Sequence, residues 1–210
     1  ERNPSCNYIG VDIKGARLWK GAKYATEHAL GNVAFLRTRI EFIESLFAEN
    51  EISEIWITFA DPQIGREKKR LTAPLFMNRY RNFLCKGGII HLKTDSRYLH
   101  EYSLAMAQQN DLHILAAATD IYGADRERLY DSELSSICGR AAVDALFEVQ
   151  TFYESQYLAQ GFPITYLSFL ADHEGDYLSP EWAEDLWKDE GHHFVIPSGL
   201  AVASKFYPEG

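Results

Sequence analysis

Short apolar segments alternate with segments of helical periodicity along the first half of the chain, and this alternation constrains the fold more than any other feature. The apolar segments have the length of strands and contain few polar residues, which is typical of strands buried on both faces of a parallel sheet. Strands are expected at residues 7–13, 33–36, 55–59, 89–93 and 113–117. Helices are expected between them at residues 16–30, 40–47, 75–84 and 98–109. The sequence therefore predicts an α/β fold in which helices cover both faces of a mostly parallel sheet.

The pattern is weaker in the rest of the chain. A helical span is expected within residues 141–159, and a late strand at 163–170. Residues 172–210 differ in character, and the cap, proline and early acid at 179–181 predict the start of a helix. We therefore expect one domain over residues 1–171 and a C-terminal extension over residues 172–210, whose role the sequence does not indicate.

Composition narrows the class of protein. The chain has 210 residues and is 46% hydrophobic, which is enough for one well-packed domain. Its apolar runs are shorter than the roughly 20 residues of a membrane helix, and the first residues lack the apolar core of a secretory signal. Cys6, Cys85 and Cys138 are far apart and odd in number, which indicates reduced thiols in a cytoplasmic protein. His192 and His193 have no third ligand at suitable spacing, so we expect no metal site.

Three of the expected strands end close to an acidic residue, namely Asp12, Asp61 or Asp95. Ligands of such sheets bind beyond the carboxyl ends of the strands. The carboxylate of Asp12 suits the two hydroxyls of a ribose, but it could equally cap the helix that follows. Pro62 holds Asp61 extended with its side chain available, although an Asp-Pro turn is common in any loop. Asp95 could likewise belong to a helix cap.

A run of positive charge follows Asp61 in a chain whose net charge is −9, and it consists of Arg66, Lys68, Lys69 and Arg70. Charge runs usually form a solvated surface. Cations at the start of a helix, however, oppose the helix dipole unless an anion binds there. We therefore interpret this run as a patch for the phosphates of a nucleic acid.

Several segments, taken in order, resemble the bacterial tRNA guanine-N7 methyltransferases. They are "NYIGVDIKGARLW", "NVAFL", "IWITFADPQ", "KKRLT", "GGIIHLKTD" and "TFYESQYLAQGFPITYL". The family has a "GVEI"-like strand, a Phe-x-Asp-Pro segment followed by basic residues and "RRLT", a "HFKTD" strand and a late Thr-x-Tyr-Glu motif. The common order and spacing of these pieces make the resemblance specific, and it covers about residues 3 to 170.

The resemblance implies a Rossmann-like class I methyltransferase that uses S-adenosylmethionine to methylate N7 of a guanine in the tRNA variable region. It implies that Asp12 binds the cofactor ribose and that Asp61, placed between cofactor and substrate, is the active-site acid. Contacts to the substrate would come from Asp95, Thr151, Phe152, Tyr153 and Glu154. Whether the protein is a monomer or a homodimer is left open.

The sequence also departs from the family pattern. The family's first strand and glycine-rich cofactor loop would lie just before Glu1, so the chain is either a fragment or holds the methionine end of the cofactor differently. Arg39 takes the place of the family's acid at the cofactor adenine, and Gln63 stands where tryptophan is common. The missing glycine-rich loop and Arg39 support an alternative, in which the protein is an inactive or non-tRNA-directed relative that acts as a binding module.

Overall fold

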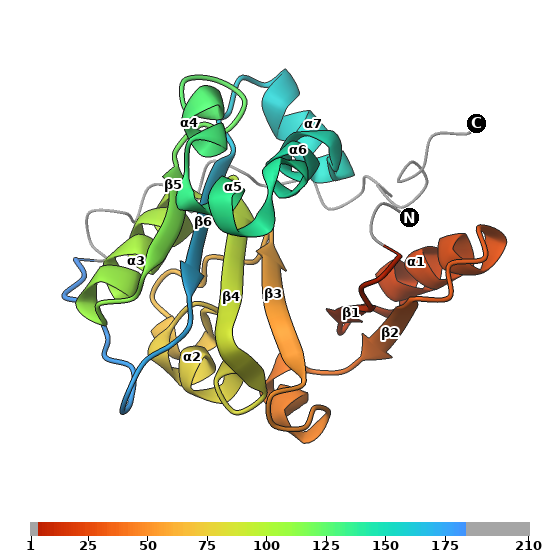
Figure 1. Cartoon of the computed structure of the whole chain (residues 1–210), viewed down its shortest axis with the longest axis horizontal. Helices are drawn as coiled ribbons and strands as arrows, with labels where there is room; N and C mark the ends of the chain where they lie inside the picture. The colour runs from red at the N-terminus through yellow and green to blue at the C-terminus, as the bar shows by residue number, and fades with distance from the viewer. Residues whose placement is uncertain (1–3, 184–210) are drawn as a thin grey trace. The chain divides into compact units, whose positions relative to one another are not determined.

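The computed structural model describes residues 4–183 of the chain, which forms two compact units, Glu1–Ala48 and Glu49–Gly210. Figure 1 labels the helices and strands of both units. Among the described residues, no helix is long and apolar enough to cross a membrane. Over the same part of the chain, no group of three or more His, Cys, Asp or Glu side chains is placed to hold a metal ion.

The first unit is a β-α-β arrangement. Strands β1 (Tyr8–Asp12) and β2 (Val33–Arg37) pair in parallel, and helix α1 (Gly15–Glu27) makes the crossover that a parallel pair requires. The helix expected at 40–47 is instead the short 3-10 helix η1 (Ile40–Ser45), without a side-chain cap. Its β-branched and aromatic residues have only modest helix propensity, which explains the difference.

The second unit contains a four-stranded sheet in the order β3-β4-β6-β5. The strands are β3 (Ile52–Thr58), β4 (Leu84–Thr94), β5 (Ile114–Ala118) and β6 (Thr165–Leu170). β3 and β4 are parallel, whereas β6 runs antiparallel to both β4 and β5. The latest strand among the described residues, β6, therefore lies inside the sheet, and the expected strand at 163–170 is confirmed.

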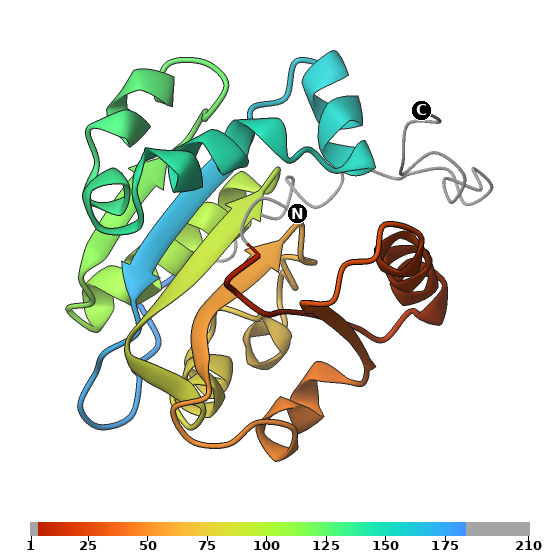
Figure 2. The ribbon, with the colours of Figure 1, turned by 45° about the vertical axis from the view of Figure 1, so that its right-hand side comes forward.

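Helices cover both faces of this sheet, as the sequence predicts. Figure 2 shows α2 and α3 on one face and α4 to α6 on the other. The α-helices of this unit are α2 (Pro74–Tyr80), α3 (Arg97–Gln109), α4 (Arg126–Tyr130), α5 (Glu133–Cys138), α6 (Arg140–Glu148) and α7 (Phe152–Ala159). A short 3-10 helix, η2 (Glu67–Lys69), precedes α2. The single helical span expected at 141–159 is thus two helices, and the short α4 and α5 were not expected.

Strand β4 begins earlier than expected because it contains a wide bulge. Ile52 of β3 pairs with Leu84, whereas Glu54 already pairs with Ile89, so the intervening residues of β4 bulge out. Gly87 adopts a φ of +74° there, a conformation that favours glycine, and its N–H donates to the carboxylate of Asp172 at 2.9 Å. Gly87 and Gly88 therefore lie in a bulge within the strand.

Residues 172–182 belong to the second unit and contact helix α3 within it. Asn110, at the end of α3, exchanges two hydrogen bonds with the backbone of Leu178, and the Trp182 ring meets the rings of Tyr98 and Tyr102 edge-on. A domain boundary at residue 171 stays a prediction. The described part of the expected helix, residues 180–183, is not helical, and its remainder lies outside the described residues, as do His192 and His193.

Candidate active site at the strand ends

One edge of the four-stranded sheet gathers the ends of several segments. β3 and β4 are parallel and in register from Glu54 onward, so the loops that follow them leave from the same edge. β6 starts at this edge, where Thr165 pairs with Thr94, and helix α7 comes shortly before it in the chain. Lys93, near the end of β4, also contacts Val149 and Glu154, which flank the start of α7. Residues 59–63, the end of β4 and the segment leading into α7 therefore meet at one edge, where ligands of α/β sheets bind.

The loop that carries Asp61 has an uncommon backbone conformation. Phe59 and Gln63, on either side of Asp61, have φ angles of +49° and +52°, which non-glycine residues rarely adopt. Oδ1 of Asp61 accepts a hydrogen bond from the Gln63 N–H at 2.9 Å. The described residues supply no partner for Oδ2, and the side chain is exposed. One oxygen thus shapes the loop, while the other is available to a ligand.

Arg70 contacts this loop from the interior of the protein and does not lie on the surface. Its side chain is completely buried, and its guanidinium donates to the carbonyl oxygens of Pro62 at 2.9 Å and Gln63 at 3.1 Å and to the Tyr98 hydroxyl. The guanidinium also lies over the Tyr102 ring, 3.9 Å from its centroid. The expectation that Arg70 contacts phosphates is therefore wrong, because burial removes it from any surface patch.

The other three basic residues of the run are exposed. Arg66 precedes η2, and Lys68 and Lys69 lie in its last turn. These cations do not oppose a helix dipole, because positive charges near the C-terminal end of a helical turn are favourably placed. The dipole therefore gives no indication that an anion binds here. Exposure alone keeps these three side chains available to phosphates.

Asp95 contacts helix α7 and does not cap α3. The cap of α3 is Ser96, whose side chain accepts from the Leu99 N–H at 3.1 Å. Burial raises the pKa of the Asp95 carboxyl, and a hydrogen bond from Tyr157 partly opposes this shift. Burial and the nearby Asp95 in turn raise the pKa of Tyr157 to about 12. The end of β4 and α7 are thus joined by a carboxylate and a phenol.

The predicted substrate motif, Thr151 to Glu154, forms the start of α7. Thr151 Oγ1 accepts from the Glu154 N–H at 3.1 Å, and Glu154 Oε2 accepts from the Thr151 N–H at 3.1 Å, which is a complete capping box. The Glu154 side chain has no exposed surface, and its Oε1 lies 2.6 Å from Lys93 Nζ. The expectation that Glu154 contacts the substrate directly is therefore wrong, because its carboxylate is buried and bonded within the protein. Phe152 and Tyr153 are half-buried, and Tyr153 is close enough to raise the Tyr157 pKa.

In the first unit, Asp12 is the last residue of β1 and Arg39 follows the end of β2 by two residues, so both lie at the carboxyl-terminal end of the parallel pair. Asp12 Oδ1 accepts from the Lys14 N–H at 2.8 Å, so the carboxylate does shape the turn into α1. Its Oδ2 lies 3.3 Å from Arg17 Nη1 in a partly exposed ion pair. Arg39 is exposed, precedes η1 and pairs with Glu41 at 3.6 Å.

Comparisons with known proteins agree with this picture. Residues 1–130 match a protein family described as "Putative methyltransferase". A tRNA (guanine-N(7)-)-methyltransferase of Christiangramia forsetii is 51% identical over 170 residues, which cover 80% of this chain and 69% of that protein. Proteins of the same name from Bacteroides fragilis and Porphyromonas gingivalis are 44% and 41% identical, covering 95% and 86% of this chain and 73% and 68% of their own length.

The chain belongs to the tRNA (guanine-N(7)-)-methyltransferase family. The resemblance that the sequence motifs indicate is thereby confirmed. Among solved structures, the [4+2]-cyclase SpnF matches with a TM-score of 0.46 and 16% identity, over 79% of this chain and 66% of that one.

Three residues of this tRNA methyltransferase family member gain importance only from the structure. The sequence alone assigns no role to Lys93, Tyr122 or Tyr157. A lysine within the apolar run "GGIIHLKT" signals a buried partner, because an unpaired buried ammonium is costly. Tyr157 follows Tyr153 by four residues, which places both on one face of a helix. No comparable signal marks Tyr122.

Proposed function

We propose that the protein transfers a methyl group from S-adenosylmethionine to N7 of a guanine in the variable region of tRNA. Membership of the tRNA (guanine-N(7)-)-methyltransferase family supports the reaction class. The observation that carries the proposal is Asp61, an exposed carboxylate in a loop that a buried arginine fixes at the ligand-binding edge of the sheet.

The residues of the first unit fit the adenosine part of the cofactor. S-adenosylmethionine would supply a methyl group activated by a positively charged sulfur. The only side-chain partner of Asp12 Oδ2 in the described residues is Arg17, at 3.3 Å and partly exposed, and such pairs are weak enough for a ribose hydroxyl to compete. The planar guanidinium of Arg39 could stack on an adenine, where a carboxylate would accept a hydrogen bond instead.

The chemistry requires alignment more than it requires a base. N7 of guanine has a free lone pair and carries no proton, so no group has to deprotonate it. Holding reactants in the correct geometry lowers barriers by up to about 7–11 kcal/mol in favourable cases. As N7 gains a bond, the guanine ring becomes positively charged and its N1–H and amino group become stronger donors. We propose that Asp61 accepts from these groups and so binds the transition state more tightly than the substrate.

Other residues at the same edge would bind the rest of the substrate. Asp95 is the second candidate acceptor for the guanine edge. Phe152 and Tyr153 would stack on the unstacked base, which is how proteins commonly hold RNA bases, while Thr151 supports them. Arg66, Lys68 and Lys69 would contact tRNA phosphates without reading the sequence.

Replacing Asp61 tests the proposal directly. The parent protein should transfer tritium-labelled methyl groups to tRNA. The methylated tRNA should then undergo the RNA strand cleavage that is diagnostic of N7-methylguanosine. Asp61→Asn keeps the Gln63 N–H bond but removes the charge, so kcat should fall by about 100-fold or more while tRNA binding is kept. Steady-state kinetics and a gel-shift assay measure the two quantities.

Asp111→Asn is the matched control, because Asp111 is an exposed acid before the amino end of β5, at the opposite edge of the sheet. It should leave kcat unchanged. Near-normal turnover by Asp61→Asn would rule out the proposed role of Asp61. A parent protein that binds S-adenosylmethionine but methylates no tRNA would contradict the proposed function itself.

A further inference from the structure

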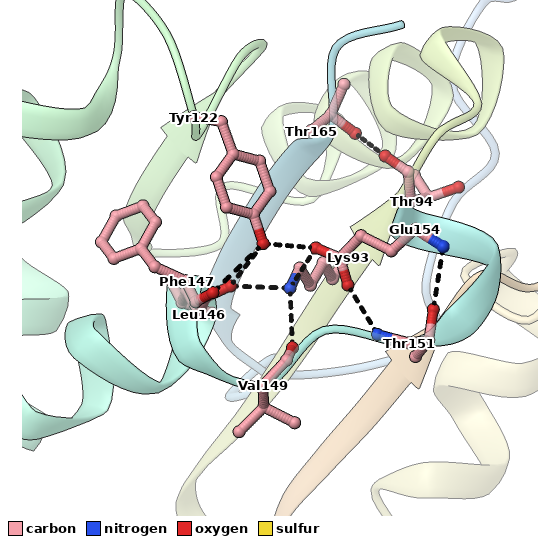
Figure 3. A network of polar contacts seen from close by, with 9 residues as sticks. All are labelled: Lys93, Thr94, Tyr122, Leu146, Phe147, Val149, Thr151, Glu154 and Thr165. Atoms are coloured by element: carbon pink, nitrogen blue, oxygen red, sulfur yellow. Dashed lines mark hydrogen bonds and ion pairs between the residues drawn. The ribbon is translucent and has the colours of Figure 1, made fainter. Parts of the chain in front are cut away.

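Lys93 is a buried cation near the carboxyl end of β4, an inner strand of the sheet, and its contacts are unusual. Only 5% of its side chain is exposed. Its Nζ lies 2.6 Å from Glu154 Oε1 and donates to the carbonyl oxygens of Leu146 at 2.7 Å and Val149 at 3.2 Å, as Figure 3 shows. An ammonium has three protons to donate, so these contacts satisfy it completely.

These contacts join three elements of the second unit. Leu146 belongs to the last turn of α6 and Val149 follows it directly, so their carbonyl oxygens would otherwise lack helical partners. Glu154 lies in the first turn of α7. A cation at the end of one helix and a carboxylate at the start of the next match both helix dipoles. Lys93 thus ties the α6–α7 connection to strand β4.

Glu154 extends the network to the substrate motif. Besides Lys93, its Oε1 accepts from the Tyr122 hydroxyl at 2.7 Å, and its Oε2 accepts from the Thr151 N–H. Thr151 Oγ1 in turn accepts from the Glu154 N–H (Figure 3). Both carboxylate oxygens are therefore used inside the protein, and the backbone between residues 149 and 154 is fixed from both ends.

We propose that Lys93 and Glu154 are positioning residues that set the place of Phe152 and Tyr153 relative to Asp95 for methyl transfer. Asp95 follows Lys93 by two residues, and Asp95 contacts Tyr157, one helical turn after Tyr153. The strand that carries the candidate acceptor thus also fixes the helix that carries the aromatic side chains. This inference rests on the proposed function, because it assigns those aromatic side chains to the target base.

The variant that tests it removes both charges. Lys93→Met alone would leave Glu154 buried without its partner and could unfold the protein. Lys93→Met/Glu154→Gln removes the pair at nearly constant shape, and the glutamine oxygen can still accept from the Thr151 N–H. The exposed pair of Lys23 and Glu27 on α1, 3.6 Å apart, offers the matched control Lys23→Met/Glu27→Gln.

Two measurements separate positioning from plain structural support. Hydrogen exchange should become about tenfold faster at the amides of residues 149–154, while the amides of Ile90 and Leu92 in β4 stay protected. The kcat for tRNA methylation should fall about tenfold or more with the KM for tRNA within about threefold of the parent, because phosphates dominate affinity and the base position governs the reaction. The control variant should change neither quantity.

A folded double variant with unchanged exchange at 149–154, or with unchanged kcat, would overturn the inference. If the double variant does not fold, Tyr122→Phe replaces it, because it removes one bond to Glu154 and no charge. It should speed exchange at the same amides and lower kcat about threefold, and parent values for both would equally overturn the inference. A parent protein without tRNA methylation would refute the proposed function, while the exchange comparison would still decide whether the pair fixes the segment.

Discussion

His91 illustrates how single polar residues are accommodated inside β4. Its ring stacks on the Trp56 ring with centroids 3.9 Å apart, and its Nδ1 lies 2.7 Å from the Tyr166 hydroxyl. Its Nε2 lies 3.3 Å from the carboxylate of Glu54. Burial lowers the pKa of His91, and Glu54 opposes the shift without cancelling it. The folded protein therefore favours the neutral imidazole.

This preference predicts that the protein becomes less stable in mild acid. The unfolded chain takes up a proton at His91 near its ordinary pKa of 6.5, whereas the folded protein does so only at lower pH. The free energy of unfolding should therefore fall as the pH drops below about 6.5, because the unfolded state binds more protons. Urea unfolding at several pH values measures this dependence.

His91→Gln should weaken that dependence without abolishing it, because burial also lowers the pKa of His100. His28→Gln is the control, since His28 is exposed at the C-cap of α1. An identical slope of stability against pH in the parent and in His91→Gln would contradict the prediction.

Residue types were readable from the sequence, but the directions of side chains were not. Arg66, Lys68, Lys69 and Arg70 look alike as a run of cations, yet only Arg70 turns inward. The partners that make this favourable are Tyr98 and Tyr102, which are about 30 positions away in the sequence and supply no local signal.

At the scale of elements, the Asp61 loop depends on helix α3. Arg70 is held between two tyrosines of α3 and in turn holds the carbonyl oxygens of Pro62 and Gln63. These bonds offset the unfavourable φ angles of the loop. The candidate active-site carboxylate is thus fixed by a side chain that never reaches the surface.

Removing the Arg70 guanidinium should therefore destabilise the second unit and loosen the loop. Arg70→Met should lower the free energy of unfolding by about 3 kcal/mol, since hydrogen bonds to a charged group are lost and two carbonyl oxygens are left without a partner. Urea unfolding gives this value. Lys69→Met, a change of the neighbouring exposed residue, should have little effect, and equal losses in both variants would refute this role of Arg70.

The periodic elements were predicted within a few residues, and the irregular ones were not. α1, α3, β1 and β2 follow clear apolar patterns, and all four are present. The bulge in β4 and the break between α6 and α7 depend on Asp172 and Lys93, whose contacts are distant in sequence. Local hydrophobic periodicity does not indicate contacts between residues distant in sequence, so the shape of the candidate site could not be predicted from it.

At the scale of the whole molecule, a basic patch persists on an acidic protein. The net charge is −9, yet Arg66, Lys68 and Lys69 remain exposed next to the Asp61 loop. Affinity for nucleic acid follows the local charge at the contact, because each neutralised phosphate releases counterions. The overall charge therefore does not oppose tRNA binding at this edge.

Removing the patch should make tRNA binding less sensitive to salt. Changing Arg66, Lys68 and Lys69 together to glutamine should reduce the slope of log affinity against log salt by about two to three units. Binding measured from low to moderate salt gives this slope. Lys86→Gln, in the β4 bulge at the opposite edge, is the control. A slope that is the same in the triple variant and the parent would show that these side chains do not contact phosphates.

The position of β6 has a consequence for how the protein is made. β6 is the last strand of the sheet to be synthesised, yet it separates β4 from β5. The sheet can therefore not close until residue 170 has left the ribosome, and the neighbouring edges of β4 and β5 stay unpaired on the nascent chain until then. During that interval the unpaired strand edges expose the growing polypeptide to aggregation.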